Sequence, residues 1–148
     1  MALVADSGGI YALYDAADVH HAAVQHAVEN DPGPIIVPVA ILAELDYLLR
    51  SHLGVEAETA FLDDVVQGAF QLAPLTAEDL PRCRSLLVKY RNLDLGLADT
   101  AVIATAERLK IYRVLTVDQR DYRVVRADLD GPFVVLPYDE APEPRQTR

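Results

Sequence analysis

Short, almost wholly apolar runs alternate with longer stretches of helical periodicity along this chain. Apolar runs bounded by turn residues predict buried strands, here over residues 3–6, 34–38, 70–75, 113–118 and 133–137. Apolar residues at helical spacing predict helices over residues 10–17, 19–29, 39–52, 55–67, 77–90 and 97–109. Because strands alternate with helices throughout, the fold class is α/β, with a parallel sheet covered on both sides.

Local signals set the predicted ends of these elements. Asp18 and Thr76 are expected to cap the helices that follow them, and Gly54 is expected to end the third helix. Pro74 places its strand near an edge of the sheet or at the strand's own end.

Two predicted helices carry a carboxylate on an apolar side. The i+3 and i+4 neighbours of Asp99 are Val102 and Ile103, which predicts that this acid faces the core. Glu44 is likewise flanked by apolar residues in the third helix. A carboxylate that faces a core needs a cation or hydrogen-bond donors. For Asp99 the local alternative is that it serves the helix N-terminus and its dipole.

Two further acids end predicted strands. Asp6 closes the first strand and Asp118 the fourth, where Thr116 shares its face by the period of two. Ligand sites of open α/β sheets lie outside the carboxyl ends of the strands. Asp6, Glu44, Asp99 and Asp118 are therefore expected to meet there around Mg²⁺ or Mn²⁺, hard ions that take carboxylate oxygens. Each acid also has a local explanation, as a turn, cap or salt-bridge residue.

Other chemistries find weaker support. His20, His21 and His26 lack partners at ligand spacing, which disfavours zinc. An aspartyl-nucleophile phosphatase needs a second acid where Gly8 stands. A phospho-receiver domain needs a lysine at a late strand end, whereas Lys89 and Lys110 lie within or directly after predicted helices.

The net charge of −10 argues against nucleic-acid binding by bulk electrostatics. It leaves room for a protein whose acids are concentrated at a metal site, since bound cations reverse the local field. Six of the 13 basic residues lie within residues 108–126, where they form either a local positive rim or an ordinary solvated surface.

The 148 residues suit a single domain, expected over residues 1–137, with a disordered tail over residues 138–148. No apolar run is long enough to cross a bilayer, and the start of the chain lacks the pattern of a signal peptide. Cys83 is the single cysteine and is expected to be a packed residue. These features favour a reducing cytoplasm.

Four segments together resemble a known family. They are Val4-Ala-Asp6-Ser7, Val39-Ala-Ile-Leu-Ala-Glu44-Leu-Asp-Tyr-Leu-Leu, Leu97-Ala-Asp99-Thr-Ala-Val-Ile-Ala-Thr-Ala-Glu and Leu115-Thr-Val-Asp118-Gln-Arg-Asp-Tyr. In this order and spacing the chain, over residues 3–137, resembles PIN-domain ribonucleases of the VapC toxin type. The family's four acids fall on Asp6, Glu44, Asp99 and Asp118.

The resemblance implies a three-layer sandwich, one or two Mg²⁺ or Mn²⁺ ions, and hydrolysis of an RNA phosphodiester to 5′-phosphate and 3′-hydroxyl ends. It also implies a homodimer and inhibition by a small antitoxin. Ser7 and Thr116 are either donors that orient the acids or purely local hydroxyls. Tyr122 replaces the commoner phenylalanine, a change expected to be harmless. Asp121 stands where family members vary, and Asp94 is expected to be a turn or cap residue.

One alternative stays open, a non-catalytic PIN fold that acts by docking a protein. The apolar character of residues 39–52 and of the neighbouring helices exceeds what one small core needs. It predicts a hydrophobic groove for an antitoxin segment and a face for a second copy of the chain.

Overall fold

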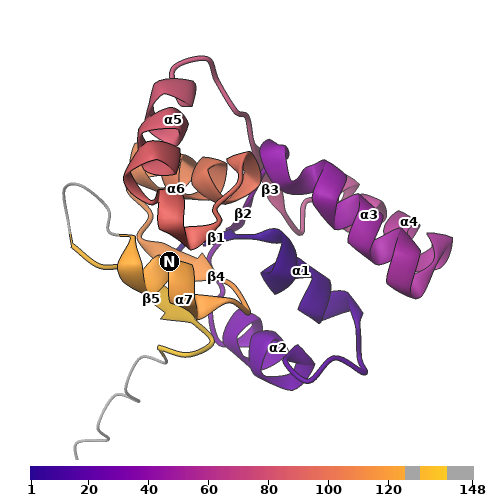
Figure 1. Ribbon diagram of the computed structural model, residues 1–148. Coiled ribbons are helices and arrows are strands. Elements are labelled where there is room, and N and C mark those ends of the chain that lie inside the picture. The colour runs from indigo at the N-terminus through magenta and orange to yellow at the C-terminus, as the bar shows by residue number, and fades with distance from the viewer. Residues whose placement is uncertain (126–130, 140–148) are drawn as a thin grey trace, which may run out of the picture.

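The computed structural model describes residues 1–125 and 131–139, and Figure 1 shows how their elements are arranged. The strands are β1 (Leu3–Ala5), β2 (Ile35–Pro38), β3 (Gln71–Ala73), β4 (Arg113–Leu115) and β5 (Val134–Leu136). The helices are α1 (Ser7–Tyr14), α2 (His21–Glu29), α3 (Leu42–Leu53), α4 (Val55–Val66), α5 (Leu80–Lys89), α6 (Leu97–Leu109) and α7 (Gln119–Val124), with short 3₁₀ turns η1 (Val39–Ile41) and η2 (Arg91–Leu93).

The strands form one all-parallel sheet in the order β3-β2-β1-β4-β5. The chain first moves from β1 outward to β3 and then returns to place β4 on the other side of β1. Right-handed crossovers therefore put α1 to α4 on one face of the sheet and α5 and α6 on the other. This confirms the α/β sandwich, and the direction of winding reverses between β1 and β4.

The core lies on both faces of the central strands. Val4 and Val114, which are paired in register, are fully buried. On one face α6 packs against β1 and β2 and is covered by α5, so that every residue from Thr100 to Ala106 is buried. The prediction that α6 buries only one side is wrong. A helix that lies between a sheet and a second helix has little surface left for solvent.

Several predicted ends need correction. The helix predicted from residue 19 begins at His21, and the Asp18 carboxylate accepts a hydrogen bond from the backbone N–H of His20 in the preceding turn, at 2.7 Å. The helix predicted from residue 77 begins at Leu80. There Thr76 donates through its backbone N–H and its hydroxyl to the carboxylate of Asp79 and caps nothing.

Other predictions are confirmed. Gly54 ends α3 with a φ of +91°, a conformation that favours glycine. The strand that precedes Pro74 lies at the edge of the sheet. Asp94 has a φ of +57° and ends a short 3₁₀ turn, as expected of a turn residue.

Two residues of the predicted tail are bonded to the domain. The hydroxyl of Tyr138 donates to the backbone carbonyl of Val117 at 2.8 Å. The carboxylate of Asp139 accepts from the backbone N–H of Val135 at 2.8 Å. The rest of that segment, residues 140–148, lies outside the described residues. None of the helices that the structure describes has the length and apolar character needed to cross a membrane.

Candidate active site

The reversal of winding between β1 and β4 is the place where open α/β sheets bind ligands. Asp6 follows β1, and Thr116 begins the turn after β4. Here α1 approaches β4 so closely that a Cβ atom on Gly9 would lie 2.4 Å from the carbonyl oxygen of Leu115. The glycine therefore allows the first turn of α1, and with it Asp6, to lie against the end of β4.

The Asp6 carboxylate is held by three donors. Its Oδ1 accepts the backbone N–H of Gly9 at 2.8 Å, which caps α1. Its Oδ2 accepts the hydroxyl of Thr116 at 2.5 Å and that of Tyr122 at 3.3 Å. Burial raises the pKa of Asp6 to about 6, these bonds oppose the rise, and the charge of Asp99 adds to it. The charge of Asp99 is the smallest of these effects, and it indicates that Asp99 lies near Asp6.

Asp99 lies in the first turn of α6, and its Oδ2 accepts the backbone N–H of Gly96 at 2.9 Å. The local interpretation of this acid, as a residue that serves the helix N-terminus, is confirmed. The prediction that Asp99 faces the core is wrong, because the residue is exposed. The first turn of α6 extends past the buried stretch that starts at Thr100, so the side chain is open to solvent beside Asp6.

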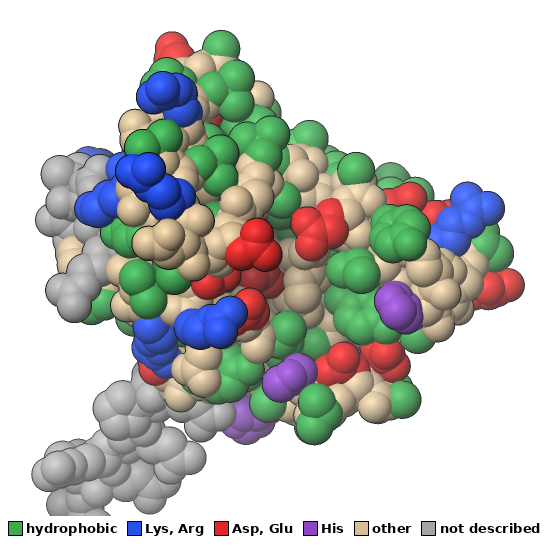
Figure 2. All heavy atoms as spheres, in the orientation of Figure 1, with side chains coloured by type: hydrophobic (Ala, Val, Ile, Leu, Met, Phe, Trp, Pro, Cys, Tyr) green, Lys and Arg blue, Asp and Glu red, His purple; other side chains and the backbone are tan. Residues whose placement is uncertain are grey.

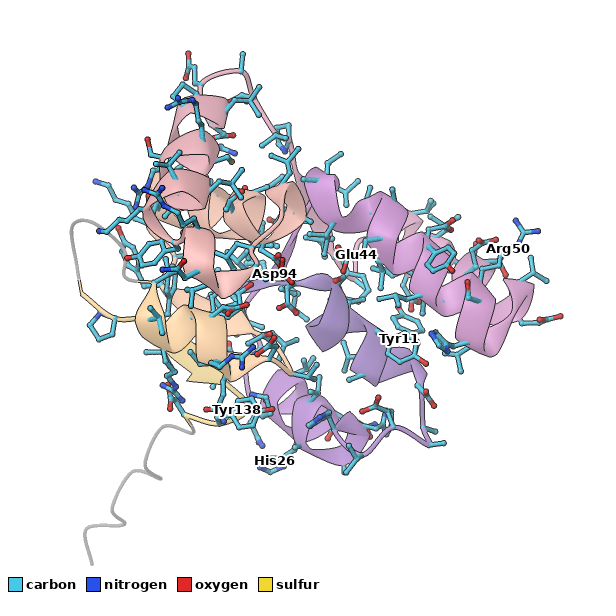
Figure 3. All side chains as sticks on the ribbon, viewed as in Figure 1. Tyr11, His26, Glu44, Arg50, Asp94 and Tyr138 are labelled. Atoms are coloured by element: carbon cyan, nitrogen blue, oxygen red, sulfur yellow. The ribbon has the colours of Figure 1, made fainter. Side chains whose placement is uncertain are left out.

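Glu44 lies in the first turn of α3 and is also exposed, which corrects the expectation that it faces apolar residues. Its Oε1 accepts the hydroxyl of Ser7 at 2.9 Å. Because Ser7 directly follows Asp6, this bond ties Glu44 to the same end of the sheet. Figure 3 shows Glu44 projecting from α3 toward the first turn of α1.

Asp118 caps α7 by accepting the backbone N–H of Arg120 at 3.3 Å. Its own backbone N–H donates to the hydroxyl of Thr116 at 3.1 Å, and that hydroxyl in turn donates to Asp6. Thr116 thus connects the turn that carries Asp118 with the carboxylate of Asp6. Asp118 is exposed, and its position agrees with both its local interpretation as a cap and its interpretation as a site residue.

Two neighbours on α7 add to what the sequence predicted. Burial, followed by the charges of Asp118 and Asp99, raises the pKa of Asp121. Its Oδ1 is buried without a hydrogen-bond partner among residues 1–125 and 131–139. Tyr122 is buried, and its hydroxyl contacts Asp6. Burial and the nearby carboxylates keep the pKa of Tyr122 well above its usual value, so its hydroxyl stays a donor. The only sequence signal for this contact was a tyrosine in place of phenylalanine.

Figure 2 shows Asp and Glu side chains gathered at the centre of the face that carries these residues. As placed, no group of three or more His, Cys, Asp or Glu side chains within the described part of the chain is arranged to hold a metal ion. The donor set nevertheless fits Mg²⁺ or Mn²⁺, since Mg²⁺ keeps several waters and needs only one or two carboxylates beside substrate phosphates. A cation held by these acids would offset the burial of the Asp6 carboxylate, which is the main cause of its raised pKa, and the smaller effect of the Asp99 charge.

Of the two alternatives for the basic residues within 108–126, the structure favours an ordinary surface over a positive rim for several members, because long-range ion pairs occupy them. Arg108 pairs with the buried Asp79 at 3.0 Å, and Arg123 pairs with Asp139 at 2.6 Å. Arg126 lies outside the described residues. Arg120, beside the acids, is exposed and forms no ion pair with any residue that the structure describes.

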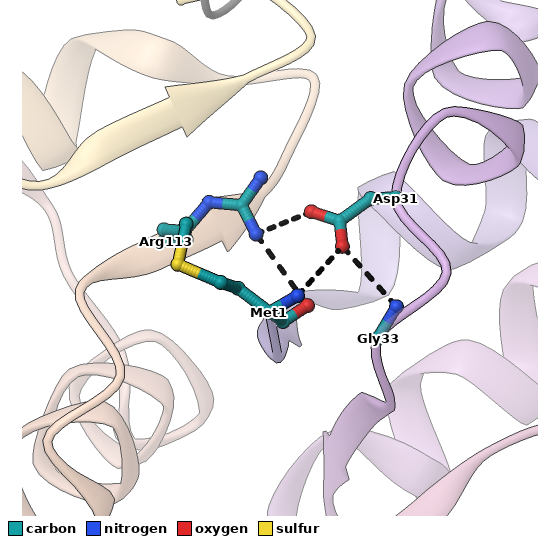
Figure 4. Close-up of polar contacts among 4 residues, drawn as sticks. All are labelled: Met1, Asp31, Gly33 and Arg113. Atoms are coloured by element: carbon teal, nitrogen blue, oxygen red, sulfur yellow. Dashed lines mark hydrogen bonds and ion pairs between the residues drawn. The ribbon is translucent and has the colours of Figure 1, made fainter.

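Arg113 is occupied at the opposite end of the sheet from the acids. Figure 4 shows its guanidinium paired with Asp31, whose Oδ1 also accepts the backbone N–H of Gly33 at 3.3 Å. Burial opposes ionisation of Asp31, but the bonds and charge of Arg113 hold its pKa below the usual value. This pair joins the start of β4 to the loop before β2 and is structural.

Comparisons with known proteins agree with this geometry. The PIN-domain family model matches residues 3–127. The chain is 33% identical to Ribonuclease VapC26 of Mycobacterium tuberculosis over 135 residues, which cover 91% of this chain and all of that protein.

Solved structures show the same fold. VapC20 of M. tuberculosis, described as a toxin that cleaves the sarcin–ricin loop, superposes with a TM-score of 0.74 at 18% identity, over 80% of this chain and 91% of its own. A toxin–antitoxin complex from Klebsiella pneumoniae gives 0.65 at 15% identity, over 83% and 92%. This chain therefore belongs to the PIN-domain family, among the VapC-type ribonuclease toxins.

Proposed function

We propose that this VapC-type protein is an endoribonuclease that uses Mg²⁺ or Mn²⁺ to hydrolyse an RNA phosphodiester, leaving 5′-phosphate and 3′-hydroxyl ends, in the cytoplasm. The observation that carries the proposal is that hydrogen bonds hold acids from separate segments at one end of the sheet: Ser7 donates to Glu44, and Thr116 joins Asp6 to the turn that carries Asp118. Such an arrangement is unfavourable in the free protein and becomes favourable when a divalent cation is shared.

Asp6, Glu44, Asp99 and Asp118 are the residues proposed to hold the cation. When bound, the ion supplies Lewis acidity, which activates a water molecule and stabilises charge on the leaving oxygen. Ser7 orients the carboxylate of Glu44, and Thr116 orients that of Asp6. These hydroxyls restrict the rotamers of the two acids before an ion binds, so less conformational entropy is lost on binding.

The competing function is a PIN fold that only docks a partner, and Asp99→Asn separates the two. Asparagine keeps an acceptor for the N–H of Gly96, so the start of α6 is preserved while the charge beside Asp6 is lost. We expect this variant to fold and to bind its partner but to cleave no RNA.

The test is sequencing of RNA 5′ ends after brief induction, with wild type, Asp99→Asn and, as a matched control, Asp63→Asn on the exposed face of α4. New 5′-phosphate ends with wild type and the control, and none with Asp99→Asn, support the enzyme. Equal ends in all three would overturn it. The same data identify the RNA.

We further propose a small antitoxin and a second copy of the chain as partners. The toxin–antitoxin complex among the structural neighbours supports the first. Tyr47 on α3 and Val66 on α4 are 70% and 86% exposed, on adjacent helices that Figure 1 shows extending away from the sheet. Such apolar exposure suits docking of a protein segment. A basic antitoxin residue that reaches the acids would inhibit by competing with the metal.

This second proposal is tested by sizing the protein at high concentration and by assaying cleavage with its antitoxin. A dimer whose activity falls when antitoxin is added supports it. A stable monomer whose activity the antitoxin leaves unchanged contradicts it.

A further inference from the structure

Tyr122 places a hydroxyl inside the acid site. The residue is 4% exposed and its ring packs edge-on against Phe133, with centroids 5.9 Å apart, so the side chain has little freedom to turn away. The hydroxyl donates to Oδ2 of Asp6 at 3.3 Å. A buried tyrosine needs a partner for its hydroxyl, and Asp6 provides it.

The carboxylate of Asp6 is nearly saturated with donors. An ionised carboxylate offers about four lone-pair positions on its two oxygens. Gly9 uses one on Oδ1, while Thr116 and Tyr122 use both on Oδ2. The remaining position is therefore on Oδ1, and its direction is fixed because all three donors come from packed backbone or side chains.

We propose that Tyr122 is a positioning residue, whose hydroxyl acts with that of Thr116 to lock Oδ2 of Asp6 and so present one free lone pair on Oδ1 to a divalent cation. This inference rests on the proposed metal-dependent function. It assigns a role to the Tyr122 hydroxyl, whereas the sequence predicted that tyrosine in place of phenylalanine would have no effect. This role also explains why Asp6 has only one free acceptor position, since without Tyr122 a lone pair on Oδ2 would be open as well.

The test compares Mn²⁺ affinity, measured by titration calorimetry, in wild type, Tyr122→Phe, Thr116→Val and the double variant. Phenylalanine keeps the buried ring and removes only the hydroxyl. Loss of groups that orient metal ligands commonly weakens metal affinity about 10- to 100-fold. We expect about 3- to 10-fold for Tyr122→Phe, because its bond is the longer one, and a larger loss for Thr116→Val.

The double variant tests whether both hydroxyls act on the same oxygen. If they do, its loss of affinity differs from the product of the two single losses by at least about twofold. Losses that simply multiply would contradict a shared action on Oδ2. RNA cleavage by Tyr122→Phe is expected to recover at saturating Mn²⁺, whereas a defect that persists there would contradict a role through metal affinity.

Tyr14→Phe is the matched control, because the hydroxyl of Tyr14 donates to Asp64 at 2.5 Å, in a bond that joins α1 to α4. It is expected to lower the free energy of unfolding without changing Mn²⁺ affinity. If wild type binds no Mn²⁺, both the proposed function and this inference fail. If wild type binds Mn²⁺ and Tyr122→Phe binds it equally well, or if Tyr14→Phe weakens it as much, only this inference fails.

Discussion

Replacement of Asp6 by asparagine is expected to stabilise the metal-free protein at neutral pH. Burial raises the pKa of Asp6 from 3.8 to about 6. At about 1.36 kcal/mol for each pH unit by which the pKa rises, this corresponds to about 3 kcal/mol. Because the folded state binds the proton more tightly than the unfolded state, stability is lost as the pH rises from about 4 to about 6 and stays lost above it.

Asparagine fits the same contacts without the charge. Its Oδ1 accepts the N–H of Gly9, and its amide donates to the hydroxyls of Thr116 and Tyr122, both of which rotate to accept. At pH 7.5 in EDTA we therefore expect Asp6→Asn to exceed wild type in the free energy of unfolding by up to about 3 kcal/mol. At pH 4 the advantage should vanish, since Asp6 is then protonated in the folded protein.

The assay is urea unfolding of both proteins at several pH values between 4 and 8 in EDTA. Subtracting the free energy of unfolding of wild type from that of Asp6→Asn cancels the contribution of every titrating group that the substitution leaves undisturbed. Added Mg²⁺ should stabilise wild type and leave Asp6→Asn nearly unchanged. A difference that does not vary with pH, or one that favours wild type more strongly at pH 7.5 than at pH 4, would refute this account of Asp6.

Three smaller predictions address the surroundings of the site. Asp121→Asn should raise the melting temperature in EDTA at pH 7.5, because it removes charge from a buried, unpartnered oxygen; a lower melting temperature would contradict this. Gly9→Ala should lower the free energy of unfolding by about 1–3 kcal/mol in urea, because its Cβ meets the carbonyl of Leu115, whereas unchanged stability would show that α1 can shift freely. Arg108→Met should cost about 1–3 kcal/mol in the same assay by leaving the buried Asp79 without its cation; a neutral effect would mean that the other donors to Asp79 suffice.

The sequence predicted the acids better than their surroundings. Asp6 and Asp118 follow strands whose apolar runs are legible, so their meeting at one end of the sheet follows from parallel topology. Glu44 and Asp99 were assigned to apolar faces from their neighbours on a helical wheel. The predicted start at residue 97 already put Asp99 in a first turn, but the wheel does not show that this turn is open to solvent. Glu44 lies in a first turn because α3 begins at Leu42 and not at residue 39.

Features that depend on distant parts of the chain were not predictable. The pairing of Arg113 with Asp31 and of Arg108 with Asp79 engages two of the basic residues clustered within residues 108–126. Neither pair has a local spacing that would reveal it. The short helix α7 was foreseen only as a segment that Asp118 caps, because Gln119–Val124 is too brief for a periodic signal. The contact of Tyr122 with Asp6 was therefore not predicted.

The central claim is that acids from four separate segments act together on one divalent-ion site. Its most direct test is titration of Mn²⁺ into wild type and into Asp6→Asn, Glu44→Gln, Asp99→Asn and Asp118→Asn, with Asp63→Asn on α4 as control. The account predicts that each of the four variants loses at least about tenfold in Mn²⁺ affinity while the control matches wild type. Wild-type affinity in the four variants would contradict it.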